Sequence, residues 1–186
     1  PYSTGDVFRQ PRLAATLKAL QENGPDEFYR GSIAARICAD MDAHGGLLTA
    51  ADFASHTADW VEPITVRYRG RTAFNLPPNT QGMASLEILN ILENFDGAAL
   101  GEGTAAYYHL LVEATKEAFA DRDRWLTDPA FLDIPLKFLL SPEHGRNQAA
   151  RISMEKAAQH VQPMDPAGDT IWLGVVDRKG CAVSLI

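Results

Sequence analysis

The residues that could carry out chemistry lie near the end of the chain, in the stretch GDTIWLGVVDRKGCAVSLI. Thr170 stands where a polar segment changes into an apolar run typical of a strand. If the bond between Asp169 and Thr170 were cleaved, Thr170 would carry a hydroxyl nucleophile and a free α-amine base. The ordinary pKa of an α-amine is about 8, so it can accept the hydroxyl proton near neutral pH. Thr170 is therefore a candidate nucleophile, and Asp169 would become a carboxyl terminus.

Each candidate also has a structural explanation. A β-branched residue is common at the start of a strand, and composition alone favours that role for Thr170 by roughly ten to one. Asp121 and Asp128 resemble paired catalytic carboxylates, but charges at helical spacing favour an ion-pair network at a helix end. Residues 76–82 lead into a helix start that could bind an anion, although two prolines favour a rigid exit from a strand. Cys181 has no histidine near it in sequence, which favours a small buried or half-buried residue.

Composition narrows the kinds of partner. The chain has 186 residues and a net charge of −7, without a basic cluster that would capture nucleic acid or an anionic membrane. No apolar run approaches the ~20 residues that a membrane span requires. The five histidines and two cysteines have no metal-ligand spacing, so neither a metal nor another cofactor is expected. A small molecule or another protein chain is the expected partner.

The elements that must position these residues are mostly helical. Apolar positions at helical spacing, together with proline, threonine and serine start signals, predict six helices. The expected helices span residues 11–23, 25–41, 49–53, 83–95, 104–125 and 141–152. Alternating runs predict a hairpin of residues 64–68 and 72–76 that turns near Gly70. Tyr107, Tyr108, Phe119 and Trp125 are expected to form part of a core stripe.

The last two expected strands, residues 172–176 and 182–186, turn at residues 178–180 and are almost continuously apolar. Such strands must be covered on both faces, and a two-stranded ribbon is only marginally stable alone. We therefore expect the sequence to be a piece of a larger protein.

Six stretches resemble the γ-glutamyltranspeptidase family of N-terminal nucleophile hydrolases. They occur in the family's order and cover almost the whole chain: GPDEFYRGSIAARI, GGLLTAADF, PITVRYRGRTAFNLPPNTQG, LEILNILENFD, EATKEAFADRDRWLTDPAF and DTIWLGVVDRKGCAVSLI. In that family a precursor cleaves itself before a threonine that opens the motif T-T-H-x-S-V-V-D. Alignment of Val175-Val176-Asp177 with the end of this motif places Thr170 on the nucleophile.

The resemblance implies an α+β chain that forms part of an αββα sandwich. Residues 1–152 would be the C-terminal part of the large subunit, 153–169 a mobile linker before the cleavage site, and 170–186 the first strands of the small subunit. Thr170 would attack a γ-glutamyl amide, such as glutathione, and pass the acyl group to water, an amino acid or a peptide. The partners would be these small molecules and the rest of the same precursor. The residues that bind substrate would lie outside this segment.

The terminal stretch departs from the common motif. It has Ile171, Trp172 and Gly174 in place of T-H-x-S, and Cys181 where asparagine is usual. Such departures suit the branch that includes cephalosporin acylases, so a glutaryl acylase is the first alternative. The second is a binding or assembly module without catalysis or processing. The resemblance implies a periplasmic or secreted protein, and a cytoplasmic location stays open.

Overall fold

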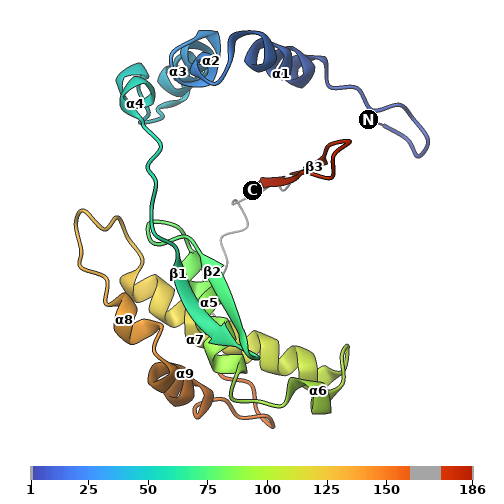
Figure 1. The fold of residues 1–186 in the computed structure, drawn as a ribbon. Helices are drawn as coiled ribbons and strands as arrows, with labels where there is room; N and C mark the ends of the chain where they lie inside the picture. The colour runs from blue at the N-terminus through green and yellow to red at the C-terminus, as the bar shows by residue number, and fades with distance from the viewer. Residues whose placement is uncertain (1, 160–172, 186) are drawn as a thin grey trace. The chain divides into compact units, whose positions relative to one another are not determined.

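The computed structural model describes residues 2–159 and 173–185 (Figure 1). The chain divides into two compact units, Pro1–Trp60 and Val61–Ile186, and each is considered by itself.

The first unit consists of short helices. They are α1 (Pro11–Asn23), α2 (Asp26–Tyr29), α3 (Ser32–His44) and α4 (Ala50–Ser55). The bounds of α1 and the Thr49 capping box of α4 confirm the predictions from sequence. The single helix predicted after Pro25 was wrong, because it breaks at Gly31 into α2 and α3. At that break the Glu27 carboxylate accepts the Ser32 N–H at 2.9 Å and so caps the start of α3.

The second unit begins with the hairpin of β1 (Ile64–Tyr68) and β2 (Arg71–Asn75), which confirms the middle hairpin. The helices that follow are α5 (Gly82–Leu92), α6 (Gly97–Leu100), α7 (Ala105–Trp125), α8 (Leu136–Leu139) and α9 (Pro142–Ala149). Thr104 and Ser141 cap α7 and α9 as expected. The sequence did not predict α6 and α8, since a helix of four residues is too short to show a period.

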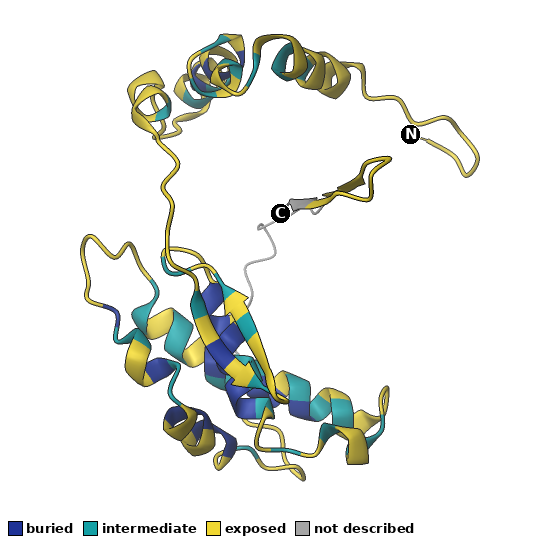
Figure 2. Cartoon of the chain, in the orientation of Figure 1, coloured by how far each residue is buried: buried dark blue, intermediate teal, exposed yellow. Residues whose placement is uncertain are grey.

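The core of this unit surrounds α5, which contacts the hairpin, α7 and α9 (Figures 1 and 2). One apolar cluster joins Ile91 of α5 to Ala114 and Ala118 of α7 and Ala149 of α9. Small side chains at these positions let the helix backbones come close together. A second cluster packs Met83 against Ile134 and Leu139 around α8.

The predicted aromatic stripe of α7 was only partly right. Tyr107 and Trp125 are half-buried. Tyr108 and Phe119, however, are 58% and 37% exposed. The residues of α7 that meet the core are Leu110, Glu113, Ala114 and Ala118, so the buried face is narrower than the apolar pattern suggested.

The second predicted hairpin is present as β3 (Leu173–Val176) paired antiparallel with β4 (Ala182–Leu185). In its turn the Asp177 carboxylate accepts the N–H groups of Lys179 and Cys181. Gly180 has φ 81°, a conformation that glycine adopts without strain. Cys181 is exposed, so the prediction of a buried or half-buried residue was wrong. Val175 and Val176 are 56% and 70% exposed, as expected of a ribbon that needs further strands.

The contact between α5 and α9 gives a test of packing. A Cβ added at Gly145 would lie 2.9 Å from Asn90 Cβ and 3.0 Å from the Asn90 carbonyl oxygen. Gly145→Ala should therefore destabilise the protein by about 1 to 2 kcal/mol, because an overpacking cost of up to about 3 kcal/mol outweighs the gain of about 1 kcal/mol in helix propensity. A lower midpoint of urea unfolding would record the loss. Gly97→Ala is the control, since a Cβ there meets nothing within 4 Å. Equal midpoints for the two variants would contradict this account.

Candidate functional site

Asp169 and Thr170, the predicted cleavage site and nucleophile, lie outside the described residues, and their roles stay predictions. The structure does describe the chain on both sides of them, up to Gln159 and from Leu173 onward. The polar groups that it brings together are on α5, α7 and α9.

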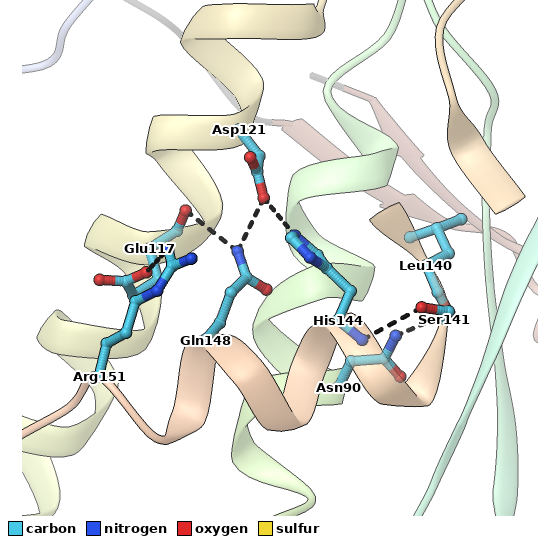
Figure 3. A network of polar contacts seen from close by, with 8 residues as sticks. All are labelled: Asn90, Glu117, Asp121, Leu140, Ser141, His144, Gln148 and Arg151. Carbon is cyan, nitrogen blue, oxygen red and sulfur yellow. Dashed lines mark hydrogen bonds and ion pairs between the residues drawn. The ribbon is translucent and has the colours of Figure 1, made fainter. Parts of the chain in front are cut away.

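A polar network joins α7 to α9 (Figure 3). The Asp121 Oδ2 atom accepts hydrogen bonds from His144 Nε2 at 2.6 Å and from Gln148 Nε2 at 2.8 Å. Gln148 Nε2 also donates to the Glu117 carbonyl oxygen at 3.3 Å. Arg151 pairs with the Glu117 carboxylate at 3.3 Å. Because His144 and Gln148 are buried, the network fixes how α9 lies along α7.

The start of α9 is held by α5 and by its own cap. Asn90 Nδ2 of α5 donates to the Leu140 carbonyl oxygen at 2.9 Å. Ser141 Oγ accepts the His144 N–H at 3.1 Å, and Pro142 occupies the first turn, where no N–H is needed. These contacts place the start of α9, and the bonds of Gln148 and Arg151 to α7 hold its C-terminal end.

The structure supports the structural explanation for the two aspartates. Asp121 bonds to α9, whereas the Asp128 carboxylate accepts the nearby Ala130 N–H at 2.9 Å, so each aspartate has a structural partner of its own. The ion-pair network expected at the helix end differs in its partners. Asp121 binds His144 and Gln148 of α9, and not an arginine of its own helix. Arg122 instead pairs with Asp123 at 2.7 Å.

The loop of residues 76–82 is likewise rigid. Thr80 Oγ1 donates to the carbonyl oxygens of Leu76 and Pro77, and it accepts the Gly82 N–H at 3.3 Å. The Gly82 N–H is a donor that an anion at the start of α5 would need. Because it is already bonded inside the loop, the structure favours a rigid exit from the strand over an anion site.

Glu87 of α5 is a buried acid that the sequence analysis missed. It is 0% exposed, and neither carboxyl oxygen has a hydrogen-bond partner. Burial, with a smaller contribution from the charge of Asp121, raises the pKa of Glu87 to about 9. The side chain is therefore neutral at physiological pH. Its position four residues after Met83 and four before Ile91, on the buried face, was the available signal.

The part of the chain that the structure describes contains neither a metal-binding cluster nor a membrane-spanning helix. No group of three or more His, Cys, Asp or Glu side chains there could hold a metal ion. None of the helices described is both long enough and apolar enough to span a bilayer.

Comparison with known proteins decides the family. The family model described as Gamma-glutamyltranspeptidase matches residues 1–186. The chain belongs to the γ-glutamyltranspeptidase family. Members similar to it include a glutathione hydrolase-like proenzyme of Bacillus subtilis, 41% identical over 98% of this chain and 34% of the relative. An oxamate amidohydrolase proenzyme of Klebsiella pneumoniae is 43% identical over the same shares.

A solved family structure gives the same assignment. The cephalosporin acylase from Bacillus halodurans is 38% identical, with a TM-score of 0.65 over 80% of this chain and 27% of that protein. The mixture of helices and small sheets described above is thus that of the family. The chain spans about a third of the length of the curated relatives that it matches.

The buried acid predicts an unusual dependence of stability on pH. The pKa of Glu87 is raised from its ordinary value of 4.5, which applies to the unfolded chain, to about 9 in the folded protein, so the folded state binds an extra proton between these pH values. Stability should therefore fall as pH rises from about 5 to 9, by up to about 1.4 kcal/mol per pH unit. Glu87→Gln, which cannot ionise, should remove this slope and unfold at higher urea than wild type at pH 8.

Urea unfolding of both proteins at pH 6, 7 and 8 measures the effect. Glu62→Gln, at an exposed position of the same unit, is the control and should keep the wild-type slope. Parallel slopes for wild type and Glu87→Gln would mean that Glu87 is ionised in the folded protein.

Proposed function

We propose that the full-length protein is an amidohydrolase that acts through an acyl-enzyme on Thr170, after cleavage of its own chain between Asp169 and Thr170. The family match over the whole chain carries this proposal. The proenzyme names of both curated relatives are consistent with cleavage of a precursor. Thr170 also stands five residues before Val175, which is the spacing of the threonine and the first valine in the family motif.

In the proposed cleavage, the Thr170 hydroxyl attacks the Asp169 carbonyl carbon. The C–N bond breaks, an ester forms on the Thr170 oxygen, and the nitrogen of Thr170 takes up the proton. Water then hydrolyses the ester. The products are a carboxyl terminus at Asp169 and a free α-amine on Thr170, so one residue holds both the nucleophile and its base.

In the proposed turnover, this amine accepts the hydroxyl proton while the oxygen attacks the substrate amide carbon. The proton passes to the departing amine, and an acyl ester remains on Thr170. Water, an amino acid or a peptide then takes the acyl group and restores the hydroxyl. In the parent protein, β3 and β4 would join the central sheets of an αββα sandwich, where their exposed valines would be covered.

We propose a γ-glutamyl amide such as glutathione as the first substrate class, in keeping with the family and with the glutathione hydrolase-like relative. Two alternatives have specific support. Ile171, Trp172 and Gly174 depart from the usual motif, and the acylase structure is 38% identical, which favours a glutaryl-cephalosporin. The 43% identity to an oxamate amidohydrolase favours a small amide such as oxamate as the substrate.

Intact-mass analysis of the full-length protein tests the cleavage. Wild type should appear as two fragments with the junction between Asp169 and Thr170, and Thr170→Ala as one intact chain. Thr170→Ser is the matched control, because it keeps a hydroxyl and should still be cleaved. A wild type that stays intact would refute the hydrolase and favour an uncleaved binding or assembly module.

A substrate panel separates the three amide classes. The processed protein should release aniline from a γ-glutamyl anilide at least about tenfold faster in kcat/KM than it cleaves a glutaryl-cephalosporin or oxamate, because specificity arises from groups that bind the acyl part. Thr170→Ala supplies the blank. Faster release of ammonia from oxamate, or of the free amine from the cephalosporin, would reassign the substrate while leaving the mechanism in place.

A further inference from the structure

The chain that leaves α9 is fastened to α7 through its own peptide groups. Lys116 Nζ donates to the Ala158 carbonyl oxygen at 2.9 Å, and the Glu113 carboxylate accepts the Ala158 N–H at 3.1 Å. Five residues earlier, His109 Nε2 lies 2.7 Å from the Ser153 carbonyl oxygen. His109, Glu113 and Lys116 recur at helical spacing on one face of α7. We call these three side chains the linker clamp.

The charges of the linker clamp are matched to each other. Lys116 Nζ lies 2.6 Å from Glu113 Oε1, and the Glu113 side chain is only 4% exposed. Burial alone would raise the pKa of Glu113, but hydrogen bonds from Lys116 and the Ala158 N–H outweigh it and hold that pKa below its ordinary value. Glu113 is therefore ionised, and it binds both Lys116 and the chain.

The pair does more than an ordinary ion pair on a helix surface. Surface pairs contribute little to stability, and a buried pair loses hydration on folding. Here Lys116 and Glu113 together bind both backbone groups of one residue, the carbonyl oxygen and the N–H of Ala158. Such a contact recognises backbone and fixes a position along the chain. It is therefore suited to holding a segment in place.

We propose that the linker clamp positions the chain that leads to the Asp169–Thr170 junction for self-cleavage. This inference rests on the proposed function. His109, Glu113 and Lys116 are positioning residues, since they contact Ser153 and Ala158 and not the bond that breaks.

Chain length gives the size of the effect. Ala158 is eleven residues before Asp169, whereas Ser153, which His109 still holds when the Ala158 contacts are lost, is sixteen residues before it. Eleven residues reach at most about 40 Å. The effective concentration of a tethered group falls roughly as the −3/2 power of tether length. Shortening the tether from sixteen residues to eleven thus favours the reactive arrangement about 1.8-fold.

The test is the rate of self-cleavage of the full-length precursor, followed on denaturing gels after a pulse of cell-free synthesis. Glu113→Leu with Lys116→Met removes both charges and both groups that bond to Ala158, so that no charge is left buried and unpaired. This double variant should cleave about 1.8-fold more slowly than wild type, at the same junction. Arg151→Met is the matched control, because Arg151 contacts α7 through Glu117 without holding Ser153 or Ala158. Its rate should equal that of wild type.

A second measurement separates positioning from general destabilisation. Ten glycine and serine residues inserted between Glu155 and Lys156 lengthen the chain ahead of Ala158. In wild type the linker clamp still holds Ala158, so the insertion should leave the cleavage rate unchanged. In the double variant the last fixed point is Ser153, so the same insertion should slow cleavage by a further factor of about two. Loss of stability alone would not produce this difference.

The outcomes separate the inference from the function on which it rests. A wild type that cleaves, with a double variant that cleaves at the same rate, overturns the linker clamp alone. Equal slowing by the insertion in both backgrounds also overturns it. A wild type that never cleaves overturns the proposed function and the inference with it.

Discussion

The close approach of α5, α7 and α9 is the constraint on which the rest of the second unit depends. Alanines on α7 and Gly145 on α9 allow the backbones to come near α5 without a clash. At that spacing His144 and Gln148 can reach Asp121, and Asn90 can reach the start of α9. A larger residue at Gly145 would push α9 away from α5 and so separate these polar groups. Packing here determines which polar contacts are available.

The same interior contains two carboxyl groups in opposite states. Glu87 has no partner for its oxygens and holds its proton, whereas Glu113 is paired and ionised. Both residues are buried, so burial by itself does not decide the charge. The presence of hydrogen-bond donors decides whether the carboxyl group is charged, because hydrogen bonds to the charged form offset the loss of hydration. Glu87 therefore helps to fill the core, while Glu113 binds the chain.

Local signals predicted much of the fold. Start signals at Pro11, Thr49, Thr104 and Ser141 lie next to the chain they organise, and each matches a helix in the structure. The break at Gly31 was missed because the apolar period continues across it. The contacts of Asp121 and Glu113 were missed because their partners lie more than twenty residues away. Residue types alone do not show which distant groups meet. For the candidate nucleophile, the family resemblance added what spacing could not supply.

Recognition of the chain after α9 through peptide groups alone has a consequence for how this segment can change. Lys116 and Glu113 bind the carbonyl and the N–H of Ala158, and neither contact depends on its side chain. Natural variation at Ser153 and Ala158 is thus free to alter side chains while the attachment persists. Proline at position 158 is the one exception, because it has no N–H to offer. Relatives with dissimilar residues in this stretch can share the same attachment, and sequence comparison alone would overlook it.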